Sequence, residues 1–166
     1  MDIKRWFKHL TTGQLALRFC FPQSTLNVIE QAIRQSEKLH GGEICFAVEM
    51  ALNTVPLLKN QTARERAIEV FSQLRVWDTE HNNGVLIYVL LADRDVEIIA
   101  DRGISAKVPE VEWGLICSAM ESAFRQRRFE TGVVEGIEAI GKQLAMHFPP
   151  DARKGKNELS DKPAVL

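Results

Sequence analysis

Alternation of hydrophobic and other side chains predicts three β-strands in the middle of the chain. Residues 43–50 alternate with a period of two, which is typical of a strand with a buried face. Residues 85–91 are apolar or aromatic throughout, as expected of a central strand that is buried on both faces. Residues 96–100 follow after only the short connection 92–95, so the last two strands are predicted to form a β-hairpin.

Helical periodicity predicts helices before, between and after these strands. Ser24 is expected to cap the first helix, and Thr62 and Glu65 give the capping-box pattern at the start of the second. Apolar residues recur at intervals of three and four positions, so each helix has one face suited to packing on a sheet. The predicted helices are residues 24–39, 62–74, 110–126 and 131–148.

The order of these elements predicts an α/β domain. Strands 43–50 and 85–91 are joined by a helix, so they are expected to be parallel with a right-handed crossover. Strand 96–100 then runs antiparallel to its hairpin partner. The sequence thus predicts helices layered on a small mixed sheet that contains one β-hairpin.

Three segments differ in character along the chain of 166 residues, a length that suits a single domain. Residues 1–23 form a basic amphipathic N-terminal segment, and residues 24–148 hold the periodic α/β elements. Residues 149–166 are polar and non-periodic, so we expect a flexible tail there.

The N-terminal segment has the pattern of a short membrane-surface helix. Ile3, Phe7 and Leu10 would share one helical face, with Lys4 and Lys8 on the others, which predicts weak peripheral contact with an anionic membrane. A short helix packed on the domain explains the same pattern. No signal peptide is expected, because the segment lacks a continuous apolar core.

Composition narrows the class of protein. Apolar residues make up 45% of the chain and charged residues 26%, as in ordinary soluble globular proteins. The net charge of −1 argues against a nucleic-acid partner. The longest apolar run, residues 85–92, is shorter than the about 20 residues of a membrane-spanning helix. Three cysteines without a CxxC pair predict free thiols and a reducing, cytoplasmic location.

The predicted topology gathers polar side chains at two ends of the sheet. One end is expected to carry Glu49, Asn53, Asp93, Arg94 and Asp95. The other end is expected to carry His40, Glu43, Asp78, Asn82, Asn83 and Asp101, with Glu110 and Glu112 from the loop that follows.

The second of these ends has the donor chemistry of a hard-cation site. It offers carboxylate and amide oxygens and no thiolate, which favours calcium or magnesium over zinc. The candidate catalytic residues are Asp78, Asp101 and Glu110, and Asn82 and Asn83 complete the candidate metal ligands. A cation there would lower the pKa of a bound water and polarise a phosphoryl oxygen. Solvated loops also favour Asp and Asn in their turns, so a site without chemistry remains the alternative.

The sequence Asp93-Arg94-Asp95 is similar to the DxD of aspartyl phosphatases. The returning strand begins immediately after it, which leaves no room for a nucleophile loop. These residues are therefore interpreted as the turn of the hairpin.

A basic cluster ends the third predicted helix. Arg125, Arg127 and Arg128 precede Phe129 there. They could bind an anion, although cations are also expected at a helix C-terminus because of the helix dipole.

The middle of the chain resembles the TPM domain family. That family is named for a thylakoid lumen protein, a photosystem II repair protein and an accessory subunit of a nematode acetylcholine receptor. The resemblance extends over about residues 24–148, and its most specific part is the Asn-Gly-Val-Leu strand followed by the Asp-Arg hairpin. The matching stretches are residues 41–44, 82–87, 92–98, 103–104 and 124–132.

The resemblance implies a Rossmann-like α/β/α sandwich. It also implies an acid phosphatase activity, calcium binding in some members, and roles in the repair or assembly of membrane complexes. The segment after the hairpin departs from the family pattern Gly-x-Gly-Leu-Glu, because Asp101 replaces the first glycine and Ser105 replaces the glutamate. Asp101 thereby adds a carboxylate at the same end of the sheet.

Two functions follow from the sequence. One is a phosphomonoester hydrolase assisted by calcium or magnesium, with Asp78, Asp101 and Glu110 at its centre. The other is a non-enzymatic interaction module that acts on a membrane-associated protein partner, suggested by the basic amphipathic N-terminus.

Overall fold

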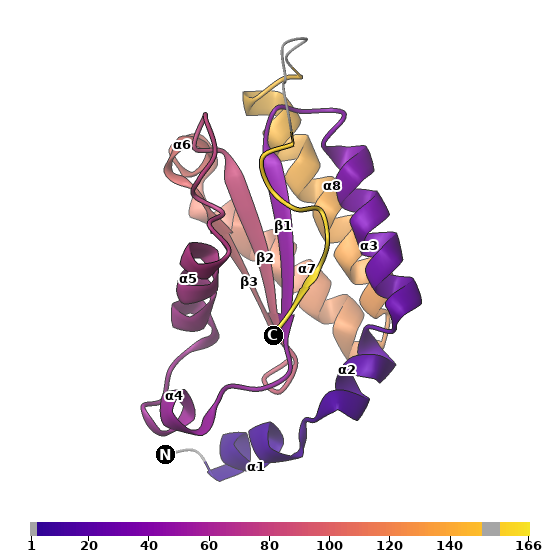
Figure 1. Cartoon of the computed structure of the whole chain (residues 1–166), viewed down its shortest axis with the longest axis vertical. Coiled ribbons are helices and arrows are strands. Elements are labelled where there is room, and N and C mark those ends of the chain that lie inside the picture. Colours follow the sequence, from indigo (N-terminus) through magenta and orange to yellow (C-terminus); the bar gives the residue numbers. More distant parts are fainter. Residues whose placement is uncertain (1–2, 151–156) are drawn as a thin grey trace.

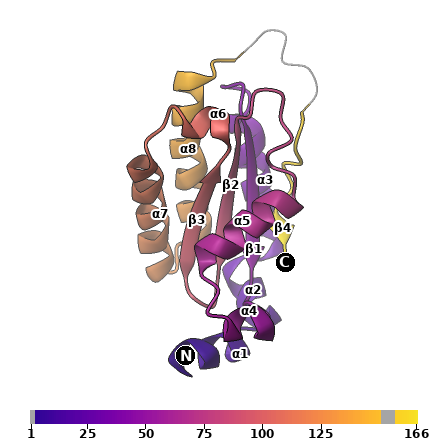
Figure 2. The ribbon, with the colours of Figure 1, turned by 90° about the vertical axis from the view of Figure 1, so that its left-hand side faces the viewer.

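The described part of the chain folds into a four-stranded mixed sheet with helices on both faces (Figures 1 and 2). The computed structural model describes residues 3–150 and 157–166. The strands lie in the order β3-β2-β1-β4. Their bounds are Glu43–Glu49 for β1, Gly84–Leu90 for β2, Asp95–Ala100 for β3 and Ala164–Val165 for β4.

Strand pairing confirms the predicted topology. β1 and β2 are parallel over their whole length, with Glu43 opposite Gly84 and Glu49 opposite Leu90. β2 and β3 form the antiparallel hairpin, with Leu90 opposite Asp95. Every residue of β1 and β2 is buried, which explains why residues 85–91 are apolar on both faces.

The structure contains more helices than the sequence predicted. The bounds are Ile3–Thr11 for α1, Gln14–Cys20 for α2, Gln23–Ser36 for α3, Thr54–Leu58 for α4, Ala63–Gln73 for α5, Arg102–Ser105 for α6, Glu110–Arg125 for α7 and Phe129–His147 for α8. Thr62 caps α5 in a full capping box with Glu65, as predicted.

Helices α4 and α6 lie in segments predicted to be loops. Pro56 suggested a break, but it sits in the first turn of α4, where a proline needs no amide donor. Similarly, α3 begins directly after Pro22, whose extended backbone serves as the cap position, and Ser24 is not the N-cap.

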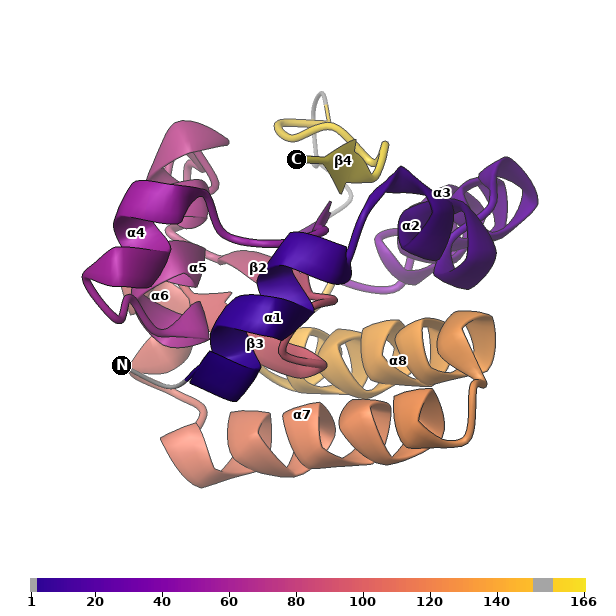
Figure 3. The same ribbon diagram turned by 90° about the horizontal axis from the view of Figure 1, so that it is seen from below.

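The helices form two layers around the sheet, which confirms the α/β sandwich (Figure 3). Helices α3, α7 and α8 cover one face, where Phe46, Ile87 and Ile137 belong to the larger core. Helix α5 covers the other face, where Ala67 and Tyr88 belong to a smaller core. Among the described residues, no helix combines the length and apolar character needed to span a membrane.

The structure differs from the predicted flexible tail in residues 157–166. Ala164–Val165 form β4, parallel to β1, and the Leu166 amide donates to the Val48 carbonyl at 2.9 Å. Asp161 is buried and accepts hydrogen bonds from Arg34 and Asn157. A strand of two residues is too short to show a period, so β4 could not be predicted from the hydrophobic pattern. Residues 151–156 of the predicted tail lie outside the described residues.

Candidate functional site

Two glycines allow the loop before β2 to pack closely, Gly84 of β2 against Val76 and Gly103 of α6 against His81 and Asn82. A Cβ atom on Gly84 would overlap the Val76 carbonyl oxygen, and one on Gly103 would collide with the carbonyl oxygens of His81 and Asn82. The Gly103 amide donates to the Asn82 carbonyl at 2.8 Å. Only glycine allows this close approach without a shift of the backbone.

A surface hollow of about 470 Å³ lies between this loop and α6. It is at the end of the sheet where β1 and β2 begin and β3 ends. The hollow brings three of the predicted site residues together, Asp78, Asn82 and Asp101. Its remaining lining residues are Trp77, Thr79, Glu80 and Arg102.

One carboxylate oxygen of Asp101, a residue that lines the hollow, is buried without a hydrogen-bond partner among the described residues. Its side chain is at the N-cap of α6, and Oδ1 accepts the Arg102 amide at 2.7 Å. The residue is only 8% exposed, and among the described residues Oδ2 is buried without a hydrogen-bond partner. A buried carboxylate oxygen without a donor is costly, so a cation or an ordered water beside Oδ2 would stabilise it.

Arg102 places a cation beside the carboxylates. Its Nε donates to Oδ1 of Asn82 at 2.9 Å, and the backbone of Asn82 is left-handed, with φ of 51°. The sequence analysis singled out neither Arg102 nor Glu80. The position of Arg102 directly after Asp101 was the available signal, since both flank the start of α6.

The other two predicted residues do not line the hollow. Asn83 is buried beside it, where Nδ2 donates to the Gly41 carbonyl at 3.0 Å. Glu110 begins α7 and forms an exposed ion pair with Arg64 at 3.0 Å. Within residues 3–150 and 157–166, no three His, Cys, Asp or Glu side chains are arranged to hold a metal ion. The predicted triad of Asp78, Asp101 and Glu110 is therefore not assembled.

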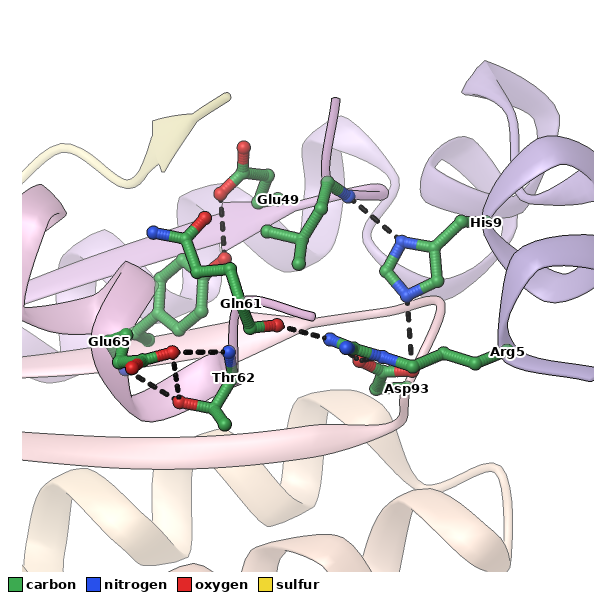
Figure 4. A network of polar contacts seen from close by, with 9 residues as sticks. Arg5, His9, Glu49, Gln61, Thr62, Glu65 and Asp93 are labelled. Carbon is green, nitrogen blue, oxygen red and sulfur yellow. Dashed lines mark hydrogen bonds and ion pairs between the residues drawn. The ribbon is translucent and has the colours of Figure 1, made fainter. Parts of the chain in front are cut away.

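The opposite end of the sheet anchors the N-terminal helix (Figure 4). Asp93 accepts hydrogen bonds from Arg5 Nε at 2.9 Å and from His9 Nε2 at 3.1 Å. His9 Nδ1 in turn accepts the Leu52 amide at 3.0 Å, which assigns the imidazole proton to Nε2. Asp93 thus does more than form the predicted turn, since it fixes α1 across the sheet end.

The pKa values of two neighbouring carboxyls in this hairpin shift in opposite directions. Burial acts to raise the pKa of Asp93, but the hydrogen bonds from Arg5 and His9 outweigh it and lower that pKa below the usual value. Burial and the nearby charges of Glu97, Glu121 and Asp93 raise the pKa of Asp95 to about 6.

The cysteines do not support nucleophilic chemistry. All three are free thiols, and burial raises the pKa of both Cys45 and Cys117 to about 12. A thiol with such a pKa carries almost no thiolate at neutral pH.

Comparisons with known proteins agree with this fold. The family model of the TPM domain matches residues 20–143. The NMR structure of protein BA42 from the psychrophilic bacterium Bizionia argentinensis is 32% identical, with a TM-score of 0.75, covering 86% of this chain and 93% of that one. A search of curated proteins gave no match.

A second solved structure is similar in fold alone. It is the NMR structure of the N-terminal domain of a protein from P. gingivalis, which is 20% identical with a TM-score of 0.59. The alignment covers 77% of this chain and 80% of that domain. Taken with the family match over residues 20–143, these findings show that the chain belongs to the TPM domain family.

Proposed function

We propose that the protein is a phosphomonoester hydrolase that works with calcium or magnesium in the hollow beside α6. The observation that carries the proposal is the buried Oδ2 atom of Asp101, which has no hydrogen-bond partner among the described residues and belongs to a residue lining the hollow. The proposal follows the name of the matching family model, which is that of a TPM phosphatase.

In this proposal the acidic residues of the hollow hold the cation and its arginine binds the phosphate group of the substrate. Asp101 and Asp78 would hold the cation, which prefers carboxylate oxygens. When bound, the cation would supply a polarised phosphoryl oxygen and a more acidic water. Arg102 would bind the remaining phosphate oxygens, and Asn82 fixes its guanidinium through the 2.9 Å hydrogen bond. Glu110 has no part in this arrangement, because it pairs with Arg64.

The test is hydrolysis of p-nitrophenyl phosphate by the purified chain between pH 5 and 8, with EDTA, calcium or magnesium. We expect turnover that requires the cation and falls by about a hundredfold or more in Asp101→Asn, given the usual worth of a charged group in a catalytic site. Glu138→Gln, an exposed substitution on α8, is the matched control and should retain full activity. Absence of turnover in every condition, or equal turnover in Asp101→Asn, would reject the proposal.

A specific observation also favours the second function, an interaction module that acts on a membrane-associated partner. Helices α1 and α2 expose large apolar side chains, with Phe7 67% and Leu15 83% exposed. Leu10 and Phe19 are similarly exposed. Exposed apolar patches of this kind commonly mark interaction surfaces. The free thiols support the cytoplasmic location that this function would have.

Cell fractionation tests the interaction module. The double variant Phe7→Ser and Leu10→Ser should move the chain from the membrane fraction to the soluble fraction. Leu39→Ser removes an equally exposed apolar side chain beyond the end of α3 and should leave the distribution unchanged. A wild-type chain that is absent from the membrane fraction would reject this function.

A further inference from the structure

A second hollow lies at the opposite end of the molecule from α6. It has a volume of about 760 Å³ and is bounded by α1, α2, the end of β2 and the turn between α7 and α8. Figure 1 shows α6 at one end of the sheet and α1 at the other, and Figure 3 shows α1 lying across the strand ends. We call this hollow the basic pocket, after the four cationic side chains on its rim, Lys8, Arg94, Arg125 and Arg127.

The floor of the basic pocket is apolar. Val89 and Phe124 line it and are almost completely buried, and Leu91 lies beside them. Phe19 of α2 and Phe129 of α8 contribute aromatic walls. This lining can accept a hydrocarbon chain, because apolar surface there is already shaped and held by the core.

The rim of the basic pocket is cationic, and only one of its four cations has an acidic partner among the described residues. No carboxylate is among its described lining residues. Arg125 has one loose contact with Glu121 at 3.7 Å, whereas Lys8, Arg94 and Arg127 form no ion pair within the described part of the chain. Like charges gathered at one rim repel each other, and an anion between them would relieve that repulsion.

The backbone at two of these cations is itself unusual. Arg94 and Arg127 adopt left-handed conformations with φ of 56° and 60°. Side chains other than those of glycine and asparagine rarely adopt this conformation. The charges of both arginines lower the pKa of the Cys20 thiol, against a larger rise caused by burial, so both guanidinium groups lie near the same pocket wall.

The location fits a ligand site. The basic pocket lies at the carboxyl ends of β1 and β2, since Val89 and Leu91 lie at the end of β2 and Glu49 is opposite Leu90. Ligands of α/β sheets commonly bind outside the carboxyl ends of parallel strands. The TPM match begins at residue 20, so α1 and most of α2, which wall the pocket, are additions to the matched region.

We propose that the basic pocket binds a single-chain amphiphile with an anionic head group, such as a fatty acid or an alkyl phosphate. The head group lies between Arg94, Arg127 and Lys8, and the hydrocarbon chain lies along Phe19, Leu91 and Phe129, which line the pocket. Inorganic phosphate would leave the apolar floor unused, and a neutral amphiphile would leave the cations unpaired. The proposal is independent of the hydrolase site beside α6.

Calorimetric titration with dodecyl phosphate, kept below its micelle concentration, tests the proposal. We expect saturable binding of one molecule per chain. Dodecyl maltoside, with the same hydrocarbon and a neutral head, and inorganic phosphate, with the same head and no hydrocarbon, should each bind at least about tenfold more weakly, since either loses one class of contact.

Matched variants separate the pocket from general charge effects. Arg94→Gln and Arg127→Gln together should weaken dodecyl phosphate binding by about tenfold or more, and Phe19→Ser should weaken it as well. Arg75→Gln is the control, because Arg75 is exposed and also left-handed, with φ of 56°, but lies outside the pocket. Thermal melting of each variant checks that the fold is kept.

Three outcomes would overturn the proposal. They are absence of saturable binding, equal affinity for dodecyl maltoside, and unchanged affinity in the folded double arginine variant. Sedimentation with phosphatidylglycerol vesicles distinguishes a membrane surface from a single molecule. Binding to vesicles in the absence of any binding to monomeric dodecyl phosphate would assign the cations to a membrane surface and reject the pocket.

Discussion

At the scale of single residues, the hairpin between β2 and β3 shows how neighbours decide the behaviour of a carboxyl group. Asp93 has two hydrogen-bond donors from α1, Arg5 and His9, and its pKa is lowered. Asp95 is two residues away, partly buried among other acids, and its pKa is raised to about 6. The sequence places both in a polar turn and gives no means of telling them apart, because the donors come from a segment over 80 residues distant.

Substitution of Asp95 should make stability less dependent on pH. A carboxyl whose pKa is raised on folding contributes stability below its unfolded pKa of about 4, and this contribution is lost as pH rises through the folded value of about 6. Asp95→Asn removes the charge and should raise the free energy of unfolding at pH 7.5 by on the order of 1 kcal/mol, after allowance for solvent screening. Urea unfolding at pH 4 and 7.5 measures the difference. A stabilisation that is equal at both values would contradict the assignment.

At the scale of elements, much of the sheet was predictable and the connections were not. The hairpin and the capping box of α5 have local signatures in residues 82–98 and 62–65, and the structure contains both. Helices α4 and α6 have four or five residues each, too few to show a period. Asp78, Asn82 and Asp101 meet because two strands carry them to one end, whereas Glu110 is carried away with the start of α7 to Arg64.

The contact between α1 and the hairpin should depend on one charge. Asp93→Asn keeps the turn but removes the carboxylate that Arg5 and His9 bind, so amide exchange in α1 should accelerate by roughly tenfold, which corresponds to a lost charged hydrogen bond. Asp95→Asn, at the start of β3, is the control: the hydrogen bonds from the described residues of α1 to the hairpin go to Asp93, so exchange in α1 should stay unchanged.

The same contact should weaken in acid. A carboxyl whose pKa is lowered on folding contributes stability above its unfolded pKa of about 4, and this is lost as pH falls through the lower folded value. Hydrogen exchange followed by mass spectrometry measures amide exchange in α1, both in Asp93→Asn and in the wild-type chain at low pH. Unchanged exchange of α1 in Asp93→Asn would mean that packing alone holds the helix.

At the scale of the whole molecule, the last described residues protect the edge of the sheet. β4 covers one side of β1, and hydrogen bonding continues from Val48 to Leu166. Without β4, the buried strand β1 would present unpaired amides and carbonyls, and such an edge invites pairing with another chain. Residues 157–166 were predicted to be a flexible tail because they are polar. Backbone hydrogen bonds and the contacts of Asp161 hold them in place, and a hydrophobic pattern does not reveal such contacts.

Deletion of residues 164–166 should expose that edge. We expect a loss of about 1–2 kcal/mol in the free energy of unfolding, from a small number of lost hydrogen bonds, together with self-association at high concentration. Lys162→Gln leaves β4 in place and is the control. Light scattering after size-exclusion chromatography and urea unfolding measure the two effects. A deleted chain that stays monomeric and equally stable would show that β4 has no protective role.

The separation of β1 and β4 along the chain also bears on biosynthesis. More than a hundred residues lie between the end of β1 and Ala164. At a translation rate of roughly 5–20 residues per second, β1 leaves the ribosome on the order of ten seconds before its outer partner is made. During that interval the edge of β1 that β4 later covers is unpaired. A chaperone that bound the nascent chain would then protect this edge from pairing with other chains.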